Sequence, residues 1–137
     1  MDKLEQIFAL QQQFQDKLKR ERNLQDVPME QWLQKQTLAM VSELAELLEE
    51  VNFKWWKNPH PLHEEQIREE ITDLLHFLVS MCLEAGISAE DLYQTYVGKN
   101  RENVRRQDGL SAKPGYAVHP DGMETAEKPE AGSPAGQ

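Results

Sequence analysis

The chain has 137 residues, with 24 Asp and Glu against 15 Lys and Arg, so its formal net charge at pH 7 is −9. Such a charge repels a polyanionic duplex and therefore disfavours nucleic acid as a partner. The length and the hydrophobic fraction of 39% fit one soluble domain, and no apolar stretch approaches the roughly 20 residues that a membrane span needs.

Cysteine usage and the first residues predict where the protein resides. Cys82 is the single cysteine, which excludes an intramolecular disulfide and is typical of a reducing compartment. The chain begins MDKLEQIF, a segment without the basic stretch and apolar run of a signal peptide. We therefore expect a cytoplasmic location and no membrane partner.

The first predicted element is an amphipathic helix over residues 2–22. Its apolar side chains form one stripe at helical spacing, made of Leu4, Ile7, Phe8, Phe14 and Leu18. Gln, Lys and Asp fill the other faces. Residues 23–28 predict a connection, because Pro28 can open a helix but cannot lie inside one.

A second helix is predicted from Met29 to Phe53, and apolar residues cover a broad arc of it, as expected for a central helix. The segment FKWWKNPHP follows, where Asn58, Pro59 and Pro61 break the periodicity. These residues predict a loop that carries two indoles and two lysines.

A third helix is predicted over about 63–85, because apolar residues recur there in steps of three and four, and Gly86 ends it. Ser88 then caps a fourth helix, with Asp91 three residues later in an approximate capping box. We expect the fourth helix to end near Gln107.

Four helices joined by short connections predict an all-α bundle of four to five helices. From Ser111 the composition shifts to Pro, Gly, Ala, Glu and Ser, without the apolar periodicity that would offset the entropy of ordering. We therefore expect a helical domain over residues 1–110 and a flexible tail over 111–137. The apolar second and third helices have more surface to bury than one chain supplies, which favours a dimer.

Each of the two central helices carries a pair of acids three positions apart, Glu43 with Glu46 and Glu70 with Asp73. Residues at this spacing project from one helix face, and here the faces border the core. Carboxylates in such a place lose hydration and repel one another, so a cation must neutralise them. Carboxylates that converge from facing helices suit Mg²⁺. The competing interpretation is a solvated acidic face, which we expect for the remaining glutamates of these helices.

Lys99, Asn103 and Arg106 are spaced i, i+4, i+7 and therefore line one face of the fourth helix. A guanidinium fork, an ammonium group and an amide suit an oligophosphate chain. On spacing alone, a basic helix end favoured by the helix dipole is the simpler interpretation.

The loop between the acidic helices carries Trp55 and Trp56, flanked by Lys54 and Lys57. An indole there would cover a base or wall a pocket, whereas the alternative is that it plugs the end of the bundle. His76 follows the acidic pair on the third helix, and a structural hydrogen bond is its simplest role.

Taken together, these motifs resemble the all-α nucleoside triphosphate pyrophosphohydrolases, a superfamily that includes MazG-like proteins and the dimeric dUTPases. The resemblance covers roughly residues 4–116. Its main motif is ExxE followed by ExxD, found here in SELAELLEE and REEITDLLHF. FKWWKN, DLLHF and YVGKNRENVRRQDG look like the dimeric dUTPase branch.

The resemblance implies a helical homodimer that hydrolyses dUTP to dUMP and pyrophosphate by attack of water on the α-phosphorus. It implies Mg²⁺, two or more ions per site with Mn²⁺ as a substitute, held by Glu43, Glu46, Glu70 and Asp73. Glu43 is our candidate for orienting or deprotonating the water.

The same resemblance places the phosphates at the late motif, on Lys99, Asn103 and Arg106. Lys54 is a candidate for a further phosphate contact.

Base recognition is implied for the first helix. Dimeric dUTPases usually carry Gln followed four residues later by Asn or Asp, whereas this chain has Gln11 and Gln15. Trp56 is a third candidate for base binding. The longer side chain of Gln15 leaves open a MazG-like pyrophosphohydrolase for dCTP or a modified nucleotide. The alternative from another class is a non-catalytic helical binding module.

Overall fold

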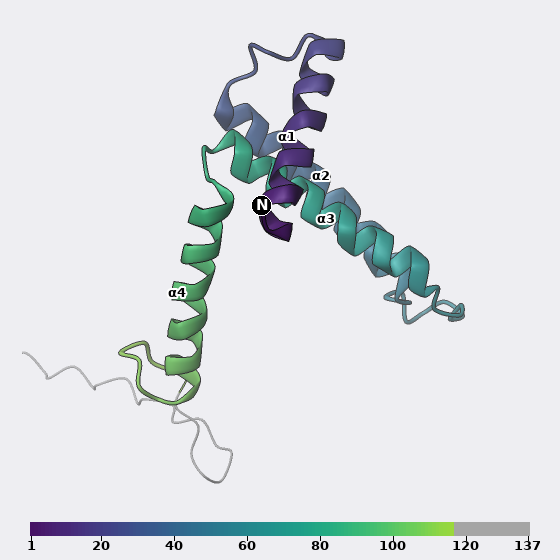
Figure 1. The fold of residues 1–137 in the computed structure, drawn as a ribbon. Helices are drawn as coiled ribbons and strands as arrows, with labels where there is room; N and C mark the ends of the chain where they lie inside the picture. Colours follow the sequence, from purple (N-terminus) through teal and green to yellow (C-terminus); the bar gives the residue numbers. More distant parts are fainter. Residues whose placement is uncertain (117–137) are drawn as a thin grey trace, which may run out of the picture. The chain divides into compact units, whose positions relative to one another are not determined.

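The computed structural model describes residues 1–116, which form helices joined by loops and contain no strand (Figure 1). The helices in this range are α1 Lys3–Arg22, α2 Met29–Glu50, α3 Glu64–Glu84 and α4 Ala89–Gln107. They confirm the prediction of an all-α protein. Most of the predicted tail, residues 117–137, lies outside the described residues.

The chain divides into two units. Met1–Leu92 contains α1, α2, α3 and the start of α4, and Tyr93–Gln137 contains the rest of α4. The boundary at residue 110 and the flexibility of the tail stay predictions.

Local capping sets the limits of α1, which agree with the predicted range of residues 2–22. The Asp2 carboxylate accepts from the Glu5 amide at 2.9 Å, and the Glu5 carboxylate accepts from the Asp2 amide at 2.8 Å. The helix ends where Asn23 takes a left-handed φ of 54° and its amide donates to the Lys19 carbonyl.

The end of α2 differs from the prediction, because the helix stops at Glu50 and not at Phe53. Asn52 has a left-handed φ of 58°. Its side-chain amide donates to the His60 carbonyl at 3.0 Å and accepts from the His60 amide at 2.9 Å. Asn tolerates this conformation better than other non-Gly residues, so a bond to a residue eight positions later overrides the apolar pattern that continues to Phe53.

The junction between α3 and α4 confirms the predicted stop and cap. Gly86 has a φ of 71°, a conformation that favours glycine. Ser88 Oγ accepts from the Asp91 amide at 3.1 Å, and the Asp91 carboxylate accepts from the Ser88 amide at 3.0 Å. These reciprocal bonds form the predicted capping box.

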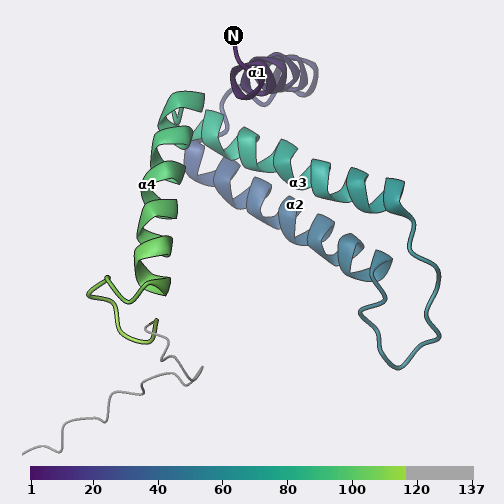
Figure 2. The ribbon, with the colours of Figure 1, turned by 60° about the horizontal axis from the view of Figure 1, so that its bottom comes forward.

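In the first unit, α2 and α3 lie side by side and antiparallel, and α1 packs against α3 (Figure 1, Figure 2). Phe8, Val79 and Cys82 form the buried core of this unit. Many large apolar side chains of the same helices stay exposed, among them Leu10, Phe14, Leu38, Val41 and Leu44. The described chain therefore leaves much apolar surface in contact with water.

Among residues 1–116, no single helix is long and apolar enough to cross a membrane. The pair formed by α3 and α4 meets the requirement by length and composition only, and it is bent by 110° at the break between the two helices.

Candidate active site

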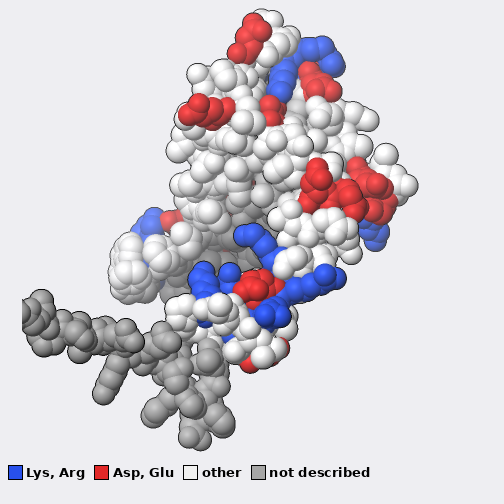
Figure 3. All heavy atoms as spheres, turned by 90° about the vertical axis from the view of Figure 1, so that its left-hand side faces the viewer, with Lys and Arg blue, Asp and Glu red and all other residues white. Residues whose placement is uncertain are grey.

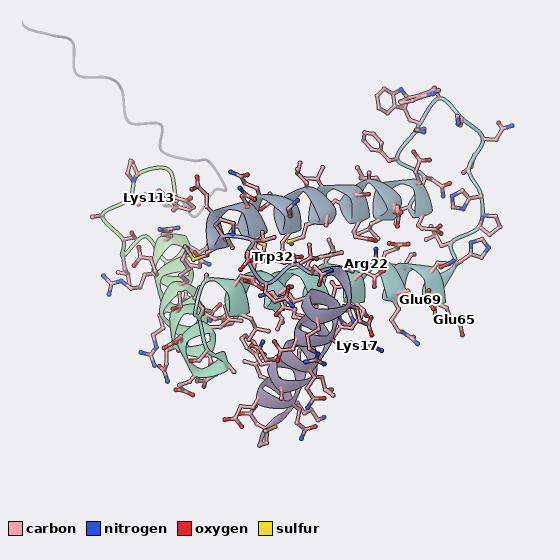
Figure 4. All side chains as sticks on the ribbon, turned by 90° about the horizontal axis from the view of Figure 1, so that it is seen from above. Lys17, Arg22, Trp32, Glu65, Glu69 and Lys113 are labelled. Atoms are coloured by element: carbon pink, nitrogen blue, oxygen red, sulfur yellow. The ribbon has the colours of Figure 1, made fainter. Side chains whose placement is uncertain are left out.

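A cavity of about 640 Å³ lies among α1, α2 and α3, inside the first unit. Its volume is in the range of small-molecule sites. Apolar side chains line much of it, and Trp32, which is 7% exposed, lies among the three helices (Figure 4). Polar groups enter the same cavity from each helix, namely Gln11, Gln15, Gln36, Glu43, Asp73 and His76.

Three of the four predicted metal ligands converge on one another, and one of them, Glu43, also lines this cavity. Carboxylate oxygens of Glu43, Glu46 and Glu70 lie within 4.8 Å of one another. The i, i+3 spacing on α2 and the side-by-side packing of α2 with α3 bring them together. Asp73, one turn after Glu70, is not in this group, but it lines the cavity together with Glu43.

The acidic cluster has a charge that the described residues leave uncompensated. Glu43 Oε2 and Glu70 Oε2 are buried and have no hydrogen-bond partner while both groups are ionised. Sharing a proton with the Glu43 carboxyl raises the pKa of Glu70 to about 7, and burial and the charge of Glu46 add to the effect. Orphaned carboxylate oxygens at this spacing fit a hard divalent cation.

Gln11 and Gln15 reach the cavity from α1, and both are buried. Gln11 Oε1 lies 3.0 Å from His76 Nδ1, which confirms a hydrogen-bonding role for this histidine. Gln15 Nε2 donates to the Ser80 carbonyl and hydroxyl and to Glu84. The two predicted base-binding amides therefore share one cavity with two of the predicted acids.

The loop between α2 and α3 contributes no side chain to this cavity. Trp56 is 61% exposed, and its ring meets the Trp55 ring edge-on at a centroid distance of 4.6 Å. Lys54 Nζ forms an ion pair with Glu49 at 2.6 Å. Base binding by Trp56 and phosphate contact by Lys54 stay predictions.

The three predicted phosphate ligands lie on α4, in the second unit. Arg106 Nη1 donates to Asn103 Oδ1 at 3.5 Å, and its Nε lies 3.4 Å from the Glu102 carboxylate. Figure 3 shows one group of Lys and Arg side chains (blue) that surrounds Asp and Glu side chains (red). Lys99 is exposed on the same helix. Phosphate binding by this set stays a prediction.

The sequence matches the family model described as dUTPase over residues 3–90. This range contains all four predicted acids and both glutamines of α1. The chain belongs to the dUTPase family. The resemblance drawn from the ExxE and ExxD motifs is thereby confirmed.

Two curated relatives of this dUTPase-family chain are phage proteins named dCTP pyrophosphatase. The protein of Enterobacteria phage T4 is 35% identical over 48 residues, and that of Enterobacteria phage LZ5 is 38% identical over 48 residues. Each match covers 35% of this chain and 28% of the relative. No solved structure matches the chain.

Several cavity residues of the dUTPase-family site escaped the sequence analysis. Lys19 Nζ lies 5.2 Å from the centroid of the Trp32 ring and forms an ion pair with Glu84 at 2.5 Å. Gln36 is 9% exposed on α2. Gln36 is a polar residue on a helix that is otherwise largely apolar. Its position could have indicated a site residue, because a buried amide needs a hydrogen-bond partner. Lys19 gave no such signal, because basic residues are ordinary in the last turn of a helix.

Proposed function

We propose that this chain is a dUTP diphosphatase that requires a divalent cation, with Mg²⁺ as the first candidate. It would hydrolyse dUTP to dUMP and pyrophosphate by attack of water on the α-phosphorus. The observation that carries the proposal is the convergence of Glu43, Glu46 and Glu70 beside a cavity that Gln11 and Gln15 also line. Membership in the dUTPase family supports it.

In this proposal, Glu43 orients the attacking water and accepts its proton. The residue suits that role because it lines the cavity and one of its carboxylate oxygens has no hydrogen-bond partner. Glu46, Glu70 and Asp73 hold the metal. Bound Mg²⁺ would neutralise charge on the phosphates and lower the pKa of the water. The number of ions, two or more, belongs to the proposal.

The phosphates are proposed to bind Lys99, Asn103 and Arg106. The contact between Arg106 and Asn103 supports a shared face, and both groups can donate to phosphate oxygens. Arg106 is paired with Glu102 in the described chain, so a phosphate would have to displace that carboxylate or bind beside it.

The second candidate substrate is dCTP, because both phage relatives are named dCTP pyrophosphatase. Uracil and cytosine each present an N–H donor next to an acceptor on the pairing edge. A pair of glutamine amides can complement either arrangement. A modified pyrimidine deoxynucleotide would fit for the same reason.

A panel of nucleoside triphosphates with product identification tests the reaction and the substrate together. We expect dUTP or dCTP to yield the monophosphate and pyrophosphate in the presence of Mg²⁺, and no turnover after chelation of the metal. Release of orthophosphate, or no hydrolysis of either pyrimidine, would contradict the proposal.

We also propose that the protein is a homodimer. Leu38, Val41 and Leu44 follow one side of α2 and are 70%, 56% and 45% exposed. Leu10 and Phe14 of α1 are 65% and 56% exposed. Apolar surface on this scale favours a second copy as cover, and the dimeric branch of the family implies the same assembly.

A further inference from the structure

The amide of Gln15 has its orientation set by α3. Its Nε2 atom lies 3.3 Å from the Ser80 carbonyl oxygen and 3.4 Å from Glu84 Oε1, and it also contacts the Ser80 hydroxyl. A backbone carbonyl and a carboxylate can only accept hydrogen bonds. The amide atom that faces them must therefore be the NH₂ group, since the amide oxygen cannot donate.

Glu84 is itself held in place by a lysine of α1. Its carboxylate forms an ion pair with Lys19 Nζ at 2.5 Å, and the two side chains are 10% and 25% exposed. Lys19 in turn lies over the ring of Trp32, which lines the cavity. This arrangement keeps an acceptor against the Gln15 nitrogen.

The amide oxygen of Gln15 is left as the atom available to a ligand. Gln15 is 4% exposed and lines the cavity, and its Oε1 atom is buried without a hydrogen-bond partner. Buried polar atoms almost always have a partner in native proteins. A buried, oriented and unpaired acceptor at a cavity points to a ligand that supplies an N–H.

Gln11 differs from Gln15 in this respect. Its partner is a ring nitrogen of His76, which donates or accepts according to its tautomer. Gln11 can therefore offer either its NH₂ group or its oxygen to a ligand, whereas Gln15 can offer only its oxygen.

We propose that Ser80 and Glu84 are positioning residues that make Gln15 an obligate acceptor, so that the site selects nucleobases with an N–H at this point. The inference rests on the proposed function, because it assigns the cavity to the base of the substrate. Uracil would use N3–H, and cytosine would use its exocyclic amino group. A base without an N–H on that edge would leave the Gln15 oxygen unpaired.

The deoxynucleoside triphosphate of 2-pyrimidinone provides the direct test. This base is smaller than uracil or cytosine and has no N–H on the pairing edge, so its rejection cannot be steric. We expect its kcat/KM to be roughly 10²-fold or more below that of the preferred pyrimidine substrate, because the buried acceptor stays unpaired. Equal kcat/KM values would overturn the inference and leave the proposed hydrolysis intact.

Two variants test the positioning role. Ser80→Ala removes one acceptor from the Gln15 nitrogen, and Glu84→Gln introduces an amide that can donate, so each loosens the orientation of Gln15. We expect a higher KM for the preferred substrate and a kcat within about twofold of that of the unsubstituted chain. The discrimination ratio, which is kcat/KM for the preferred substrate divided by kcat/KM for the 2-pyrimidinone nucleotide, should fall by roughly tenfold. Ser42→Ala, the same change at an exposed site of α2, should leave the ratio unchanged.

General loss of folded protein would lower the turnover of both substrates equally and leave that ratio as it is. An unchanged ratio in both variants would overturn the positioning role.

If neither dUTP nor dCTP is hydrolysed, the proposed function fails, and calorimetric binding of the monophosphates decides the inference separately. Binding of dUMP or dCMP about tenfold tighter than the 2-pyrimidinone nucleotide would support it. Equal or absent binding would overturn it.

Discussion

Glu43 is the residue on which the proposed chemistry depends most. It joins the acidic cluster to the cavity, because it belongs to the group within 4.8 Å and also lines the pocket. We expect Glu43→Gln to lower kcat by about 10²- to 10⁴-fold, since the amide cannot accept a proton. Pyrophosphate release measures the effect, and circular dichroism should show unchanged helicity.

Glu65→Gln is the matched control for that experiment, because Glu65 is an exposed glutamate near the start of α3 (Figure 4). It should retain the activity of the unsubstituted chain. Comparable turnover in Glu43→Gln and Glu65→Gln would remove Glu43 from the mechanism.

Glu70 is the acid whose ionisation opposes folding in the metal-free chain. Its pKa is raised to about 7, so the folded state holds the proton more tightly than the unfolded state does. Above that pH the ionised group destabilises the fold, and this effect is absent at low pH. We expect Glu70→Gln to raise Tm at pH 8 without metal, and to abolish the rise in Tm that Mg²⁺ produces in the unsubstituted chain.

Thermal scans with and without Mg²⁺ measure both parts of this prediction. Glu69→Gln, at the exposed neighbouring position, should keep the full response to Mg²⁺ (Figure 4). A Glu70→Gln protein that responds to Mg²⁺ as strongly as the unsubstituted chain would contradict the assignment of Glu70 as a ligand.

At the scale of elements, His60 connects the end of α2 to the following loop. Its Nδ1 lies 2.9 Å from the Pro61 carbonyl oxygen and its Nε2 lies 2.9 Å from the Glu49 carbonyl oxygen. Both nitrogens can donate only when the ring is protonated. Hydrogen bonds to Pro61 and Glu49 therefore raise the pKa of His60 above its ordinary value of 6.5.

The sign of this shift predicts how the loop responds to pH. A raised pKa means that the stabilisation is fully present below pH 6.5 and is lost as the pH rises through the higher value. We expect acrylamide quenching of the exposed Trp55 and Trp56 to increase over that range. His60→Gln should remove the pH dependence, and quenching that is independent of pH in the unsubstituted chain would contradict the prediction.

At the scale of the whole molecule, exposed apolar surface predicts assembly. Leu38 is 70% exposed, so Leu38→Asp removes no buried contact of the described chain. We expect analytical ultracentrifugation of the unsubstituted protein to give a mass of twice the 15.9 kDa of one chain. The Leu38→Asp variant should give a mass closer to that of the monomer.

Lys35→Asp supplies the control, because it introduces an acidic side chain at another exposed position of α2. It should leave the assembly intact. A monomeric unsubstituted protein at micromolar concentration would refute the proposed homodimer.

The helices and their caps were predictable because their causes are local. Apolar periodicity places α1, α3 and α4, and short-range bonds such as those between Ser88 and Asp91 decide where a helix begins. The end of α2 was not predictable in this way, because it depends on the bond between Asn52 and His60 across a loop.

The candidate site shows the same division between local and long-range causes. Sequence spacing alone determined that Glu43 and Glu46 share a helix face, since residues three positions apart always do. Packing of helices that are distant in sequence brings Glu70 close to that pair. It also brings Gln15 into contact with Ser80, which is 65 residues later in the chain. Only the tertiary structure decided these two contacts. Helical periodicity determines which face a side chain occupies, whereas only tertiary packing determines which other face it meets.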